Sequence, residues 1–360
     1  MLGVIVQDGE LILADDLEVR PPGPGEVSVR VLASGLCRSD LILLDHPDPD
    51  PMVMGHEAAG VVRAVGSEVA GIDVGQLVAV SCQRPCLRCP VCARGRYSAC
   101  PTAFGETERP FTWRGRTIRS TARVSSLATE ITVDAIQVHP VTGLAPEAAA
   151  LIGCAVSTGY GTVRNVAGLL PGESVAVIGV GGIGVNSIQT ARLLGAARVV
   201  AMDVNPDKEE IARRFGADEF VLVPTGVPAD LLAEELAARI GRPVDALVDC
   251  TGQHGILAAA PALLSRGGRL ALVGIPHDAT PASYDVMGTM HSHLTIAGAL
   301  NGACDPFTDL PVIVGLAEQG RLDLIGQVSH RWPLTEVRDA IDALRRGDVL
   351  RVVIEMPAAD

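Results

Sequence analysis

The segment from Ser174 to Asp203 constrains the fold of this chain more than any other part of the sequence. Val175–Ile178 is a short apolar run rich in β-branched residues, as in a buried parallel strand. A glycine pattern follows it and opens a helical pattern: Gly179, Gly181, Gly182, Ile183, Gly184. Its glycines would allow a tight turn, close approach to a pyrophosphate and close helix packing, with the helix N-terminus facing the phosphates. A second apolar run, Val199–Met202, ends at Asp203, which could bond the adenosine ribose. Glycines alone often mark only a turn, but the full combination predicts a dinucleotide site.

The rest of the chain extends this pattern into two domains. Four further short apolar runs alternate with helical patterns: Phe220–Val223, Ala246–Asp249, Arg269–Val273 and Leu294–Ala297. With the first two runs they make a complete doubly wound parallel sheet of α/β class. Residues 1–155 instead show short β-rich runs such as Val27–Leu32 and Ala58–Val65, separated by Pro and Gly turns. We expect a β-rich domain over 1–155 and 300–360 and a nucleotide-binding domain over 156–299.

Composition narrows the class of protein. The 360 residues carry a net charge of −13, which does not suggest a nucleic-acid or anionic membrane surface. No apolar run reaches the length of a membrane span, and the N-terminal residues lack the pattern of a signal peptide. Nine cysteines are present, and a cluster of them in such a chain is typical of metal binding rather than disulfides. We therefore expect a cytoplasmic protein that acts on a small molecule.

Three separated residues could form an open metal site. They are Cys37, His56 and Cys154. Two thiolates and an imidazole occupy three corners of a tetrahedral zinc site and leave the fourth open for an alcohol oxygen. Because free cysteines are commonly buried, the alternative is three unrelated core residues, and spacing alone leaves both interpretations open.

A second cysteine group gives a sharper signal. Four cysteines with the spacing Cys-x₂-Cys-x₂-Cys-x₇-Cys lie in a lobe over about residues 82–101: Cys86, Cys89, Cys92 and Cys100. Four thiolates close a tetrahedral zinc site, which makes it structural. An iron–sulfur cluster is the alternative, since Pro101 follows the last cysteine as in bacterial ferredoxins, but the last gap in those proteins is three residues. The spacing favours zinc.

Taken together, these motifs resemble the zinc-dependent medium-chain alcohol dehydrogenases along essentially the whole chain. The match is densest in Gly-Leu-Cys-Arg-Ser-Asp, Gly-His-Glu-Ala-Ala-Gly, the four-cysteine lobe, Gly-Cys-Ala-Val-Ser-Thr-Gly-Tyr-Gly and the glycine pattern. The sequence is most similar to the branch that holds the liver-type enzymes and the thiol-dependent formaldehyde dehydrogenases. The resemblance implies a Rossmann domain beside a β-rich GroES-like catalytic domain.

The resemblance also assigns roles in the catalytic domain. It implies that Cys37, His56 and Cys154 bind a catalytic zinc, with Glu57 able to approach the metal. Asp40 would orient the histidine ligand. Ser39 would take the substrate proton. A second zinc would occupy the four-cysteine lobe, which gives two zinc ions per chain.

Cofactor contacts follow from the same resemblance. Asp203 implies NAD rather than NADP, because a carboxylate there would repel a 2′-phosphate. The remaining contacts implied for NAD are two arginines at the pyrophosphate and residues near the nicotinamide and ribose: Arg38, Arg351, Thr158, Val273, Asn205 and Lys208.

Two positions depart from the liver-type pattern. Ile42 stands where those enzymes carry the histidine at the outer end of the proton relay, and His46 is a candidate replacement. Cys82 falls where the liver-type substrate pocket has an aromatic side chain, and a small core thiol is the alternative. The loop Arg119–Ser126 carries small polar residues where liver-type enzymes have bulky apolar side chains. Cys82 and this loop argue against a simple ethanol-like substrate.

The sequence thus predicts a zinc-dependent alcohol dehydrogenase that transfers a hydride between an alcohol and NAD, in either direction. Oxidation of a thiol adduct of formaldehyde is the alternative within enzymes. A catalytically silent nucleotide-binding relative is the alternative from another class, although all seven cysteine and histidine ligands are present. A homodimer or homotetramer is expected.

Overall fold

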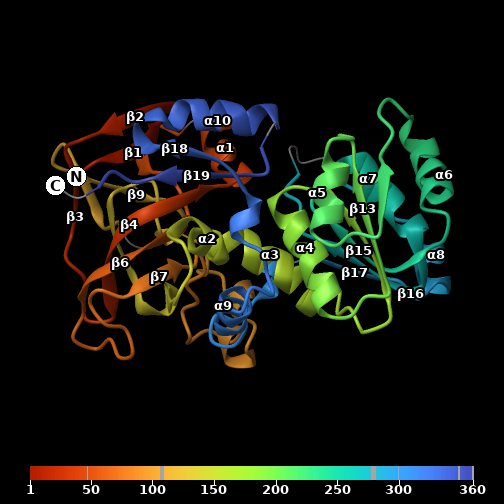
Figure 1. The fold of residues 1–360 in the computed structure, drawn as a ribbon, viewed down its shortest axis with the longest axis horizontal. Coiled ribbons are helices and arrows are strands. Elements are labelled where there is room, and N and C mark those ends of the chain that lie inside the picture. Colours follow the sequence, from red (N-terminus) through yellow and green to blue (C-terminus); the bar gives the residue numbers. More distant parts are fainter. Residues whose placement is uncertain (47, 106–108, 277–280, 299, 348, 359–360) are drawn as a thin grey trace. The chain divides into compact units, whose positions relative to one another are not determined.

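The computed structural model describes the chain except for residues 47, 106–108, 277–280, 299, 348 and 359–360. The chain divides into two compact units, one of residues 1–155 and 305–360 and the other of residues 156–304 (Figure 1). The first boundary lies between Ala155 and Val156. The second falls after Cys304, slightly later than expected, and residue 299 itself lies outside the described residues. The later boundary arises because the turn Asn301–Ala303 packs on the helix Ser157–Gly161 of the second unit.

The first unit is built on two sheets. One has the strand order β2-β1-β5-β9-β8-β3. Its strands are β1 Gly3–Gln7, β2 Glu10–Ala14, β3 Leu17–Val19, β5 Met52–Val53, β8 Phe111–Trp113 and β9 Arg116–Ser120. The other has the order β11-β7-β6-β4-β19-β18, with β10 also paired to β4. Its strands are β4 Glu26–Leu36, β6 Glu57–Val65, β7 Leu77–Val80, β10 Glu130–Asp134, β11 Val138–Pro140, β18 Val328–Pro333 and β19 Arg351–Glu355.

Aliphatic side chains fill this unit on two sides. Alternate residues of β4, such as Val27, Val29 and Val31, join Phe111 and Ile118 in one buried cluster, as the period of two in a strand allows. A second cluster packs beneath helix α10 (Val337–Arg346), whose residues Ile341 and Leu344 contribute to it. The unit also holds α1 Arg38–Asp45, α2 Pro146–Ala150 and α9 Asp309–Glu318. The expected β-rich domain is therefore present.

The second unit is a doubly wound sheet. Its six parallel strands have the order β14-β13-β12-β15-β16-β17. They are β12 Ser174–Ile178, β13 Arg198–Asp203, β14 Glu219–Leu222, β15 Val244–Asp249, β16 Leu264–Leu272 and β17 Thr295–Gly298. The helices of this unit are α3 Ser157–Gly161, α4 Gly182–Leu193, α5 Lys208–Arg214, α6 Ala229–Ile240, α7 His254–Ala259 and α8 Val286–His291. The order reverses between β12 and β15, which is where such sheets bind ligands. All six expected strands are found, with ends that shift by a few residues.

None of the described helices is long and apolar enough to cross a membrane.

Candidate functional site

The first expected metal ligand lies at the start of a helix. Cys37 directly precedes α1, and Asp40 lies within the first turn of that helix. The Asp40 carboxylate, only 1% exposed, accepts a hydrogen bond from the Cys37 backbone N–H at 2.9 Å. Its other oxygen lies 2.9 Å from Nδ1 of His56. One carboxylate therefore fixes two of the expected ligands, and Nε2 of His56 is left to face a metal.

The second ligand lies at the start of β6. Gly55, with φ of +89°, turns the chain just before His56 and Glu57. A Cβ at Gly55 would collide with the side chain of Ser126, so the turn requires glycine. The Ser126 hydroxyl oxygen accepts bonds from the Glu57 backbone N–H at 3.1 Å and from the Ser34 hydroxyl at 2.7 Å. This buried network holds the backbone that carries His56.

The third ligand comes from a distant segment. Cys154 lies in the π-helical turn Ile152–Val156, between α2 and α3. Turns of this type occur frequently at functional sites. Gly153 lets this turn approach β7, because a Cβ there would collide with the Val80 carbonyl oxygen. One candidate ligand atom from each of Cys37, His56, Glu57 and Cys154 lies within 4.8 Å of all the others.

The charges in this group suit a cation. The Cys154 thiol donates a hydrogen bond that lowers the pKa of Cys37 well below its usual value, and His56 and Arg351 add to the effect. Burial opposes protonation of His56, yet Asp40 and Cys37 raise its pKa well above the usual value. These shifts favour a thiolate at Cys37, and a divalent cation can take the place of the proton on His56 because thiolate and imidazole bind metals in their deprotonated forms. The residues present fit zinc.

Glu57 and Arg351 form a buried ion pair beside this group. Glu57 is fully buried and Arg351 is 5% exposed. Burial raises the pKa of Glu57, although the Arg351 guanidinium opposes this rise. Arg351 starts β19, which pairs with the end of β4 just before Cys37. The expected contact of Arg351 with a pyrophosphate stays a prediction.

Ser39, the expected inner end of the proton relay, lies close to His56, and its role in the relay stays a prediction. The Ser39 hydroxyl lies 3.3 Å from Nε2 of His56. Ile42 is 37% exposed on the same helix. Nδ1 of His46 lies 3.1 Å from the Ile42 carbonyl oxygen at the end of α1. His46 is thus tied to its own helix, and its role in a relay stays a prediction.

Cys82 lies beside the catalytic group rather than in the four-cysteine lobe. It is 5% exposed, and its thiol donates to the Gly153 carbonyl at 3.4 Å and contacts the Cys154 thiol. The expected role of Cys82 in lining the substrate pocket stays a prediction. The contact with Cys154 could not be read from the sequence, because 71 residues separate Cys82 from Gly153.

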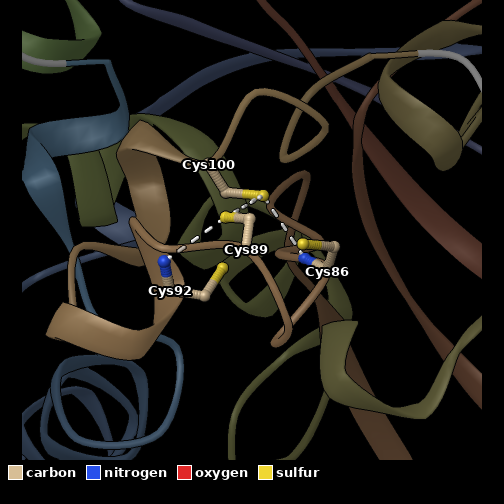
Figure 2. A group of neighbouring side chains, drawn as sticks. All are labelled: Cys86, Cys89, Cys92 and Cys100. Carbon is tan, nitrogen blue, oxygen red and sulfur yellow. Dashed lines mark hydrogen bonds between the residues drawn. The ribbon is translucent and has the colours of Figure 1, made fainter.

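The four-cysteine lobe brings its thiols together (Figure 2). The sulfurs of Cys89 and Cys100 lie 3.9 Å apart, close to the ~3.8 Å edge of a zinc tetrahedron with ~2.3 Å bonds. Backbone N–H groups of Cys86 and Cys92 donate to the sulfurs of Cys100 and Cys89, both at 3.4 Å. Such bonds stabilise thiolates, and the pKa of Cys100 falls to about 6 despite its burial, because Thr102 and the Cys86 backbone donate to its sulfur. The lobe fits a closed zinc site.

In the second unit the glycine pattern has the expected geometry. Gly179 has φ of +93°, and a Cβ at Gly184 would collide with the Gly179 carbonyl oxygen. The first glycine therefore permits the turn and the third permits the close contact between strand and helix. The Asp203 carboxylate accepts bonds from the backbone N–H groups of Val180 at 2.7 Å and Asn205 at 3.0 Å. Asp203 thus also fixes the loop that precedes α4.

The other expected cofactor residues lie at the ends of elements, and their contacts stay predictions. Arg38 is exposed at the start of α1, Thr158 is buried in α3, and Val273 follows β16. Asn205 and Lys208 lie in the turn after β13 and at the first position of α5.

The sequence did not reveal the backbone strain within the loop Arg119–Ser126. Three residues that are not glycine adopt positive φ just before Ser126: Ala122, Arg123 and Ser125. Such residues are uncommon there and cost free energy, so their cluster is typical of a functional site. No signal in the sequence marks it, because none of the three is a usual left-handed residue. Ser125 and Thr121 both bond to the Val53 carbonyl and anchor this segment beside the His56 turn.

Comparison with known proteins identifies the family. Residues 23–143 match the model described as alcohol dehydrogenase GroES-like domain, and residues 182–318 match that described as zinc-binding dehydrogenase. Alcohol dehydrogenase 2 of Zea mays is 30% identical over 97% of this chain and 95% of its own length. The chain therefore belongs to the zinc-dependent alcohol dehydrogenase family of medium-chain dehydrogenases. This membership confirms the expected family, the expected fold and, at the level of the family, zinc and NAD as cofactors.

The names of other relatives refer to different substrates. An S-(hydroxymethyl)glutathione dehydrogenase of Escherichia coli is 31% identical over 94% of this chain and 95% of its own length. The crystal structure of a benzyl alcohol dehydrogenase from Acinetobacter calcoaceticus has a TM-score of 0.88 and 28% identity, and the match covers 99% of both chains. A zinc-binding-domain alcohol dehydrogenase from Burkholderia ambifaria has a TM-score of 0.89 at 28% identity, again with 99% of both chains covered.

Proposed function

We propose that this protein transfers a hydride between an alcohol and NAD at a zinc site formed by Cys37, His56 and Cys154, with Glu57 beside it. The observation that carries the proposal is the grouping of these four side chains within 4.8 Å, because they come from three separate segments. When bound, zinc supplies Lewis acidity at the alcohol oxygen and NAD supplies the hydride acceptor. A complete ligand set argues against a catalytically silent relative.

The chain's own residues orient the site and move the proton. Asp40 accepts from Nδ1 of His56 and thereby fixes the ring and leaves Nε2 to bind the metal. The Ser39 hydroxyl, 3.3 Å from Nε2, would take the proton of an alcohol held at this zinc. Arg351 balances the charge of Glu57, so the site stays close to neutral when a cation and two thiolates are present.

We further propose NAD rather than NADP as the cofactor. The Asp203 carboxylate accepts one backbone bond on each oxygen and retains lone pairs that ribose hydroxyls could donate to. A 2′-phosphate at the same place would meet like charge. The proposed contacts of Arg38, Arg351, Thr158, Asn205, Lys208 and Val273 with the cofactor belong to the same proposal.

The test is a steady-state assay of purified protein with a panel of primary and secondary alcohols, aromatic alcohols included, read by NADH absorbance. Turnover should require the catalytic zinc, so Cys37→Ser should abolish it. The control is that zinc at the four-cysteine lobe and the melting temperature of this variant stay near those of the parent. Turnover at the parental rate in Cys37→Ser would overturn the proposal.

A second candidate is oxidation of a thiol adduct of formaldehyde. The relative from Escherichia coli named S-(hydroxymethyl)glutathione dehydrogenase favours it. The same panel with formaldehyde, alone and with glutathione or mycothiol, separates the two: activity only with the thiol present favours the adduct. Activity on simple alcohols without a thiol favours the first proposal.

The assembly and the compartment remain part of the proposal. We propose a homodimer or homotetramer in the cytoplasm. Light scattering of the purified protein measures the first, and fractionation of the producing cells measures the second.

A further inference from the structure

We propose that Cys82 and Cys154 form a reversible oxidation switch, in which a peroxide joins them in a disulfide and so releases the zinc held by Cys154. The disulfide itself is independent of the proposed function, whereas zinc release rests on the catalytic zinc site proposed above. Cys82 belongs to neither group of candidate metal ligands, so its contact with Cys154 serves no metal binding.

The pairing rests on how the two backbones meet. The Cys82 N–H lies 3.5 Å from the Gly153 carbonyl oxygen, and the Cys82 thiol lies 3.4 Å from the same oxygen. Gly153 has no Cβ, which lets the turn of Cys154 lie directly on Val80 and Ser81. The two thiols are in contact in this arrangement. Rotation about χ1 joins two such sulfurs where the Cα atoms lie within the ~4.4–6.8 Å that a disulfide spans.

Accessibility decides which thiol reacts first. Cys154 is partly exposed, whereas Cys82 is 5% exposed. As a zinc ligand at the site proposed above, Cys154 would be a thiolate. Its sulfur attacks the peroxide, the O–O bond breaks, one hydroxyl stays on sulfur as a sulfenic acid and hydroxide leaves. The Cys82 sulfur then displaces that hydroxyl, and its thiol proton leaves with it as water. The two sulfurs are oxidised by two electrons in total, and the peroxide is reduced to hydroxide and water.

Cys37 is the competing partner, because it also contacts Cys154. Asp40 holds Cys37 and His56 together through the Cys37 backbone N–H and Nδ1 of His56. With zinc bound, Cys37 is a thiolate ligand, whereas Cys82 lies outside the group of four candidate ligands. The metal therefore holds Cys37 in place, and Cys82 keeps a thiol that can resolve the sulfenic acid. Loss of Cys154 leaves too few strong ligands to retain zinc.

The experiment treats the zinc-loaded protein with hydrogen peroxide. It measures zinc release with a metal indicator and maps disulfides by mass spectrometry of peptides. We expect a disulfide between the peptides that contain Cys82 and Cys154, a fall from two zinc ions per chain to one, and recovery of both on addition of dithiothreitol and zinc. Mapping of the lobe cysteines shows whether the released ion came from there instead.

The matched variants are Cys82→Ser and Cys82→Ala, each first shown to contain two zinc ions per chain. Both should lose the dithiothreitol-reversible phase, because Cys154 then advances to sulfinic acid, which dithiothreitol does not reduce. Reversible zinc release in both variants at the parental rate, or a disulfide between Cys37 and Cys154 alone, would overturn the switch. A disulfide of Cys82 with Cys154 that leaves both zinc ions bound would instead contradict the zinc site at Cys154, and with it the release step.

Discussion

Burial of His139 should make the stability of this protein fall on mild acidification. His139 lies in β11, is 9% exposed, and faces no described hydrogen-bond partner at Nε2. Burial lowers the pKa of His139 to about 4, from an ordinary value near 6.5. The unfolded chain therefore binds a proton at a pH where the folded chain does not. The stabilising contribution is complete above about pH 6.5 and is lost as the pH falls toward 4.

The magnitude follows from these two values. A tenfold change in proton affinity is worth about 1.4 kcal/mol, so the full loss is about 3 kcal/mol below pH 4, and about 2 kcal/mol is already lost at pH 5. That is a large part of the ~5–15 kcal/mol by which proteins are stable.

The assay compares the parent with His139→Gln and His139→Phe, neither of which titrates. Denaturant unfolding is followed at pH values from 8 to 5, and the quantity of interest is the difference in unfolding free energy between parent and variant. Zinc loss and titration of other groups affect all three proteins alike and cancel. We expect both variants to gain about 2 kcal/mol on the parent between pH 8 and pH 5. Differences that stay constant over this range would refute the reasoning.

Further predictions concern the two units and their sites. Elemental analysis should find two zinc ions per chain, and Cys89→Ser should lower the melting temperature, because structural zinc contributes folding free energy directly; one zinc, or iron with sulfide, would contradict this. The parent should prefer NAD over NADP on the order of 10³-fold in kcat/KM, and Asp203→Ala should reduce this preference. Equal kcat/KM for the two cofactors in the parent would contradict the proposed role of Asp203 in selecting NAD. Single-turnover alcohol oxidation should rise steadily toward alkaline pH, and Ile42→His should raise it near pH 7 by up to ~10²–10⁴-fold; a histidine-like titration in the parent that vanishes in His46→Ala would contradict this. Finally, Ser126→Ala should cost about 1–3 kcal/mol of unfolding free energy and shift the visible spectrum of cobalt-loaded protein, while Ser126→Thr should restore both.

The second unit was the more predictable half of the fold. Its central strands β12, β13 and β15 are short apolar runs that are almost wholly buried, so their sequences contain few polar positions. β12 is followed by a glycine, and β13 and β15 end at an aspartate. The roles of Asp203 and of two glycines depend on local geometry: Gly179 has a positive φ, Gly184 lacks a Cβ, and Asp203 ends β13. Such features are encoded by single residues at fixed spacing. The second domain boundary was less predictable, because the turn Asn301–Ala303 is held by its packing on α3.

The four-cysteine lobe was likewise predictable from the sequence, because the short segment that carries the four ligands keeps them close together in space. The expected catalytic ligands were less predictable. The spacing of Cys37, His56 and Cys154 left two interpretations open, and the resemblance to a family was needed to assign them to one zinc site. Their assembly depends on the pairing of strands far apart in the chain and on the Asp40 bridge. The contact of Cys82 with Cys154 and the support of Glu57 by Ser126 left no pattern in the sequence. Side chains that meet through tertiary packing share no spacing, so only the folded chain decides which of them touch.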